Sequence, residues 1–147
     1  HEIYVRQEAR DAMTQYTAVH ARHFASILEA LASVPEGNGT MLDHTLCLWS
    51  VEVADGAHGF DRWPAVLAGG GGELSMGRYL HYPRDTPYAG WQWDLGTSTS
   101  MGVPHQKFLT SVARSMGVSI DRMPVESLRG IAGAQIDCTG TLGEMLL

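Results

Sequence analysis

An apolar run near residue 46 constrains the fold more than any other feature of this sequence. Residues 46–53 read Leu-Cys-Leu-Trp-Ser-Val-Glu-Val and are apolar at nearly every position until Ser50. A strand that is covered on both faces carries such a run, as strands of parallel sheets do. A second short run, Ala-Val-Leu-Ala at residues 65–68, is broken off at Gly69. We therefore expect residues 46–53 and 64–68 to be neighbouring strands of one mainly parallel sheet.

Two helical patterns surround these strands. Apolar side chains recur at three- and four-residue steps from Met13 to Leu31, which predicts a helix that ends before Pro35-Glu-Gly-Asn-Gly. A second helix is expected from Pro104 to Met116, with Gly117 as its cap. Its expected apolar face consists of Phe108, Leu109, Val112, Ala113 and Met116. Residues 73–102 are polar and aromatic, and we expect a long excursion there with one hairpin.

Helices that alternate with buried strands indicate an α/β fold. Two or three strands do not complete such a sheet, so the missing strands are expected upstream of His1. Residues 1–147 are accordingly predicted to be the C-terminal fragment of one larger α/β domain, and the upstream part of the same protein is its expected partner.

Composition excludes some classes of partner. Of the 147 residues 44 % are hydrophobic, the formal net charge is -6, and Lys and Arg form no run. A nucleic-acid surface needs clustered basic charge, so no nucleic acid is expected. No apolar run approaches the roughly 20 residues of a membrane span. Whether Cys47 and Cys138 form a disulfide stays open, because pairing requires their strands to lie side by side.

Glu52 and His58 are the candidate metal ligands. Sites in open α/β sheets gather beyond the carboxyl ends of strands, where Glu52, Asp55 and His58 are expected. A carboxylate and an imidazole there can bind a divalent metal or relay a proton. The alternative is a solvated loop that bonds to its own backbone, as Asp-Gly turns do. His105 reaches the site or packs within the second helix, and Gly69 to Gly72 fit a turn better than a phosphate cradle.

Several segments resemble an uncharacterised, exported bacterial family that is distantly similar to sulfatase- and alkaline-phosphatase-like proteins. The segments are Pro-Glu-Gly-Asn-Gly-Thr-Met-Leu-Asp-His-Thr (35–45), Asp-Gly-Ala-His (55–58), Pro-Ala-Val-Leu-Ala-Gly-Gly-Gly-Gly (64–72), Gly-Arg-Tyr-Leu (77–80) and Pro-His-Gln-Lys-Phe-Leu-Thr-Ser-Val-Ala-Arg-Ser-Met-Gly-Val (104–118). The resemblance implies a three-layer α/β sandwich, export to the periplasm or cell envelope, and an active site that lies largely upstream. It places Glu52 where a strand-end acid ligand stands and His58 where a later His ligand stands.

Two functions follow from this resemblance. The first is a metal-dependent hydrolase of phosphate or sulfate esters, in which zinc, manganese or calcium is held by Glu52 and His58. Asp55 would then orient His58 from the second shell, with His105 nearby. The second is a non-catalytic envelope protein that has lost the metal site. The aromatic excursion from Tyr79 to Trp93 would then bind a partner or a glycan.

Overall fold

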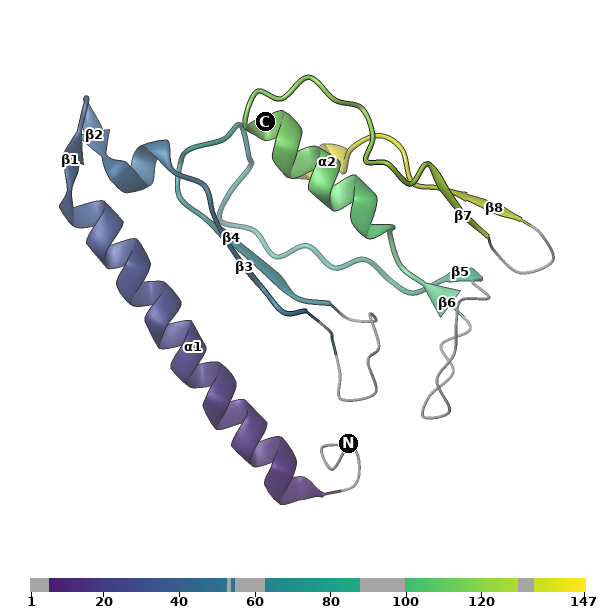
Figure 1. Cartoon of the computed structure of the whole chain (residues 1–147), viewed down its shortest axis with the longest axis horizontal. Coiled ribbons are helices and arrows are strands. Elements are labelled where there is room, and N and C mark those ends of the chain that lie inside the picture. The colour runs from purple at the N-terminus through teal and green to yellow at the C-terminus, as the bar shows by residue number, and fades with distance from the viewer. Residues whose placement is uncertain (1–5, 53, 55–62, 88–99, 130–133) are drawn as a thin grey trace. The chain divides into compact units, whose positions relative to one another are not determined.

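A computed structural model of the chain describes residues 6–52, 54, 63–87, 100–129 and 134–147 (Figure 1). The chain divides into two compact units. The N-terminal unit is His1–Gly71 and the C-terminal unit is Gly72–Leu147. No helix among the described residues combines the length and the apolar character needed to cross a membrane.

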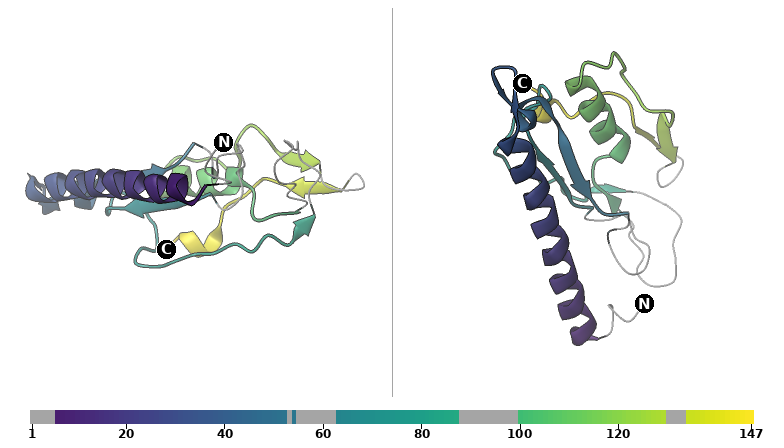
Figure 2. Two further views of the ribbon diagram at one scale, coloured as in Figure 1. Left: turned by 90° about the horizontal axis from the view of Figure 1, so that it is seen from below. Right: turned by 60° about the vertical axis from the view of Figure 1, so that its left-hand side comes forward.

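The N-terminal unit begins with one long helix, α1 (Gln7–Ser33), which is unbroken in every view (Figures 1 and 2). The helix expected up to residue 34 is therefore confirmed. It stops because Val34 and Pro35 are extended, and β1 (Pro35–Glu36) turns back antiparallel onto β2 (Gly39–Thr40). Gly37 adopts φ 58° in this turn, a conformation that glycine reaches without steric cost.

A short 3-10 helix, Met41–His44, connects this turn to the following strand. Thr40 and Asp43 close its first turn, because the Thr40 backbone N–H and hydroxyl both donate to Asp43 Oδ2, at 2.7 Å and 2.8 Å. Such a capping box satisfies donors that the helix itself leaves without partners. The bond from the Thr40 N–H is the main reason that the pKa of Asp43 lies below its usual value.

The two predicted strands are neighbours, but the parallel sheet predicted for them is wrong. β3 (Cys47–Ser50) pairs antiparallel with β4 (Ala65–Ala68), in a register that sets Cys47 opposite Ala68 and Ser50 opposite Ala65. Every sheet among the described residues has two strands, and each pair is antiparallel. The three-layer, alkaline-phosphatase-like sandwich is therefore corrected to two helices with short two-stranded antiparallel sheets.

The physical reason for this error lies in the connection between the strands. A parallel pair requires a crossover, usually a helix, whereas residues 51–64 carry no helical periodicity. The apolar run was also a poor guide to burial, since Leu48 is 41 % exposed and Val66 is 43 % exposed. The two ends of the connection are joined, because the Trp63 indole N–H donates to the carbonyl oxygen of Val51, the residue that follows β3, at 2.5 Å.

The glycine run that follows β4, residues 69–71, lies where the backbone makes close contacts. The N–H groups of Gly70 and Gly71 donate to the carbonyl oxygens of Leu42 and Thr45. A Cβ atom on Gly69, where φ is 96°, would lie 2.1 Å from the Thr45 carbonyl oxygen. These glycines thus allow close backbone packing within the N-terminal unit. Two of the N–H groups that a phosphate cradle would use are already bonded, which agrees with the turn expected from the sequence.

The C-terminal unit contains the second helix, α2 (His105–Ser115), with Pro104 at its N-cap and Gly117 at φ 81° just past its end. This confirms the helix expected near residues 104–116. β5 (Thr86–Pro87) pairs antiparallel with β6 (Ser100–Met101), which is the hairpin expected within the excursion. β7 (Ser127–Arg129) pairs with β8 (Gln135–Asp137), and a 3-10 helix, Gly143–Met145, lies near the C-terminus.

The core of the C-terminal unit is small and partly polar. Among the described residues, its buried apolar side chains are Leu74, Pro104, Cys138, Leu142 and Met145. The buried side of α2 is formed by hydroxyls, Thr110, Ser111 and Ser115, and not by the predicted apolar face, of which Met116 is 48 % exposed. Each hydroxyl donates to a carbonyl oxygen of the preceding turn, so its burial leaves no donor without a partner.

Candidate functional site

An open cavity of about 510 Å³ lies within the C-terminal unit. Residues 83, 85 and 86 of the excursion, the N-terminal end of α2, and the segment from β8 to the C-terminal 3-10 helix form its walls. Its apolar lining consists of Pro83, Val103, Pro104, Ile136 and Leu142, and its charged lining of Asp85, Lys107, Asp137 and Glu144. The volume falls within the range of small-molecule sites, which combine apolar walls with a few polar groups.

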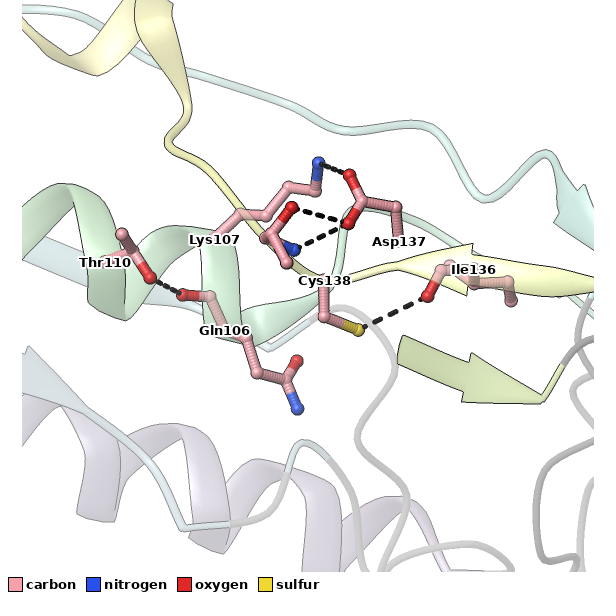
Figure 3. Close-up of polar contacts among 7 residues, drawn as sticks. Gln106, Lys107, Thr110, Ile136, Asp137 and Cys138 are labelled. Atoms are coloured by element: carbon pink, nitrogen blue, oxygen red, sulfur yellow. Dashed lines mark hydrogen bonds and ion pairs between the residues drawn. The ribbon is translucent and has the colours of Figure 1, made fainter. Parts of the chain in front are cut away.

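An ion pair crosses one side of this cavity. Lys107, in the first turns of α2, places its ammonium 3.2 Å from Oδ2 of Asp137 at the end of β8 (Figure 3). The other oxygen, Oδ1, accepts bonds from the Thr139 hydroxyl at 2.7 Å and the Thr139 N–H at 2.9 Å. These Thr139 bonds, followed by the Lys107 bond, lower the pKa of Asp137 to about 2. Asp137 is therefore a carboxylate held in one orientation at neutral pH.

The wall behind the ion pair is fixed by a buried hydrogen-bond chain. Ser111 Oγ donates to the Lys107 carbonyl oxygen at 2.8 Å and accepts the Leu142 N–H at 2.7 Å. Ser111 is fully buried, so water does not compete for these bonds. The helix that carries Lys107 is thus attached to the segment that carries Leu142 and Glu144.

Glu144 is a further charged residue of the cavity lining. The Arg78 guanidinium donates to its backbone carbonyl oxygen, and the Tyr82 hydroxyl lies beside its carboxylate. The pKa of Glu144 is lowered, first by its own backbone N–H, then by Tyr82, and also by the Arg78 charge. Burial, followed by the Glu144 carboxylate, raises the pKa of Tyr82. Glu144 is therefore ionised at neutral pH and Tyr82 is not.

The predicted metal ligands are only partly described. Glu52 is exposed just beyond the end of β3, while Asp55 and His58 lie outside the described residues. His105 belongs to the C-terminal unit, where its ring packs on Phe108 with 5.7 Å between centroids, and burial lowers its pKa. Within the described part of the chain, no three His, Cys, Asp or Glu side chains gather to hold a metal. The Glu52–His58 site stays a prediction.

The residues of the cavity were not found from the sequence. Lys107 and Asp137 are thirty positions apart, and no motif connects them. Asp-Cys-Thr at residues 137–139 is a pattern in which an Asp side chain bonds to the backbone two residues on, and this was the only available signal for Asp137. The two cysteines are free thiols, of which Cys138 is fully buried and Cys47 is partly exposed.

Comparison with family models, with curated proteins and with solved structures gives no match in any of the three.

Proposed function

We propose that this chain is a binding protein and that the cavity of the C-terminal unit is its ligand site. The observation that carries the proposal is the Lys107–Asp137 pair, which is held in place at the edge of an open, partly apolar cavity. Binding sites are largely pre-formed, because ordering a site at the moment of binding costs free energy. The site also uses Pro83, Asp85 and Thr86 of the excursion that the sequence associates with binding.

The lining favours an organic cation. Three carboxylates, Asp85, Asp137 and Glu144, face the cavity against the single ammonium of Lys107. That ammonium is already paired with Asp137, so an entering anion would meet an excess of negative charge. An entering alkylammonium would place its charge near Asp85 or Glu144. Its methylene groups would then lie on Val103, Ile136 and Leu142.

The ester-hydrolase function is a separate proposal. The parallel sheet that supported it is absent from the described residues, and phosphate and sulfate esters are anions that the cavity disfavours. It therefore rests on Glu52 and His58 together with the sequence resemblance. Metal analysis of the chain before and after His58→Ala tests it directly. Stoichiometric zinc or manganese that is lost in the variant would support the hydrolase.

Matched probes test the binding proposal. Hexylamine and hexanoate share an alkyl chain and differ in the sign of their charge. In amide NMR spectra of the whole chain, we expect hexylamine to shift Thr86, Lys107, Ile136 and Asp137, which line the cavity. Hexanoate is expected to leave these signals in place. Shifts from hexanoate alone, or no shift at millimolar hexylamine, would refute the organic-cation site.

Variants that remove one carboxylate then test whether Glu144 binds the ammonium of hexylamine. Glu144→Gln should weaken hexylamine binding up to about fivefold, which is the effect of one exposed ion pair. Asp121→Asn is the matched control, because Asp121 is an exposed carboxylate of the same unit outside the cavity. Equal weakening in both variants would indicate a general charge effect and not this site.

A further inference from the structure

Two histidines lie about one turn apart on the surface of α1. His20 and His23 are both exposed, and their ring centroids are 6.4 Å apart. Residues three positions apart on a helix are neighbours on its surface. Among the described residues, neither imidazole takes part in a hydrogen bond or an ion pair. The ring nitrogens of both histidines are therefore available to a ligand.

The spacing of the two rings suits two nitrogens on one metal ion. Bonds from zinc to imidazole nitrogen are roughly 2.0–2.1 Å long, so two nitrogens on one ion lie roughly 3–4 Å apart. Exposed side chains change rotamer within nanoseconds, and rotation of the rings brings their nitrogens to this distance from a centroid separation of 6.4 Å. Metal ligands three residues apart on one helix also occur in di-iron helix bundles, as Glu-x-x-His.

The helix surface around the pair carries no charge. The residues three or four positions from either histidine are, besides the histidines themselves, Tyr16, Thr17, Val19, Phe24, Ser26 and Ile27. Arg22 is the nearest charge along the chain, and it lies roughly 100° or more around the helix from each histidine. The Tyr16 ring packs on His20 with 4.4 Å between centroids, which restricts the His20 imidazole before an ion binds.

We propose that His20 and His23 form a surface chelate for a divalent transition-metal ion. Imidazole is a ligand for Zn²⁺, Ni²⁺ and Cu²⁺, whereas Mg²⁺ and Ca²⁺ take oxygen ligands. Cu²⁺ binds most tightly, since the affinity of a nitrogen site rises along the series to copper and falls again at zinc. Water completes the coordination shell, because the described residues supply no third His, Cys, Asp or Glu. This chelate shares no residue with the cavity of the C-terminal unit.

Titration calorimetry of the whole chain with Ni²⁺, in a buffer that does not bind metals, tests the chelate. His20→Ala and His23→Ala should each weaken Ni²⁺ binding at least about tenfold, because a second ligand on the same helix acts at a high effective concentration. His44→Ala is the control, since His44 is an exposed histidine of the same unit outside α1. His58→Ala should also leave this binding unchanged, and a loss there instead would assign the metal to the predicted Glu52–His58 site. With Mg²⁺ in place of Ni²⁺, wild type and variants should not differ.

Relocated histidines separate the chelate from the number of histidines. The double variant His23→Ala, Ala25→His moves one imidazole to an exposed position roughly 140° around the helix from His20, and it should bind as weakly as His23→Ala. The double variant Val19→His, His20→Ala sets two histidines four residues apart on one face, as in metalloprotease helices, and it should retain binding. Circular dichroism checks that each variant keeps its helices.

Three results would overturn the chelate. The first is a wild-type chain that binds Ni²⁺ no more tightly than the variant with His23→Ala and Ala25→His. The second is an equal loss of binding in His44→Ala. The third is the absence of any Ni²⁺ binding at millimolar concentration.

Discussion

The two units differ in how many of their side chains are buried. None of the described residues of the N-terminal unit is buried, and Phe24 of α1 packs on Trp49 of β3. The described part of the C-terminal unit has five buried apolar side chains and three buried hydroxyls. Regular secondary structure thus does not indicate a buried core, because the longer helix belongs to the unit whose described residues include no buried side chain. The described part of the N-terminal unit therefore obtains less stabilisation from buried apolar side chains than that of the C-terminal unit.

The largest expected effect that separates the units comes from shortening an apolar side chain. Leu142→Ala should destabilise the C-terminal unit by about 2–5 kcal/mol, because Leu142 is buried and its removal leaves a cavity. Leu48→Ala in the N-terminal unit removes the same atoms from a 41 % exposed position and should cost below about 1 kcal/mol. Amide hydrogen exchange of the whole chain measures both. Similar losses would contradict the contrast in burial.

A serine pair sharpens the comparison. Ser111 and Ser26 each donate to a carbonyl oxygen four residues earlier in their helix, but only Ser111 is buried and accepts the Leu142 N–H. Ser111→Ala should cost about 1–3 kcal/mol because it leaves a buried donor without a partner. Ser26→Ala should change the unfolding free energy by less than about 0.5 kcal/mol. Urea unfolding of the two variants gives the difference, and equal costs would show that the Leu142 bond contributes nothing.

The smallest effect concerns two exposed carboxylates, one in each unit. Hydrogen bonds from Thr139 and Thr40 lower the pKa values of Asp137 and Asp43, so each carboxylate stabilises its unit when ionised. For Asp137 this stabilisation should be complete above about pH 4 and lost as the pH falls toward its folded pKa of about 2. The stability difference between wild type and Asp137→Asn should follow this course in thermal unfolding from pH 7 to pH 2. A difference that stays constant with pH would contradict it.

Local signals in the sequence predicted local structure. The spacing from Met13 to Leu31 predicted α1, and Pro104 with Gly117 predicted the ends of α2. The hairpin of β5 and β6 and the pairing of β3 with β4 were also anticipated. Strand direction was not, because an apolar run indicates a strand without indicating which way its partner runs. The burial of the hydroxyl side chains of α2 was not predicted, because serine and threonine in a sequence usually indicate solvent-exposed positions.

The cavity shows a second limit of sequence reasoning. Lys107 and Asp137 acquire their role only when α2 and β8 are folded together, and each alone is an ordinary surface charge. By contrast, Glu52, Asp55 and His58 are close in the sequence and were therefore easy to combine into a site. The sequence shows which residues are close along the chain, but it does not show which distant residues meet when the chain folds.

The rate of Cys138 alkylation reports how often the C-terminal unit opens, because Cys138 is buried in the folded unit. Its thiol has no exposed surface, and burial together with the Asp137 charge raises its pKa, so little reactive thiolate exists while the C-terminal unit is folded. Cys47 is partly exposed and remains open to alkylating reagents. The rate at which Cys138 is alkylated therefore measures how often the C-terminal unit opens. Alkylation of Cys47 serves as the internal reference, so no engineered label is required.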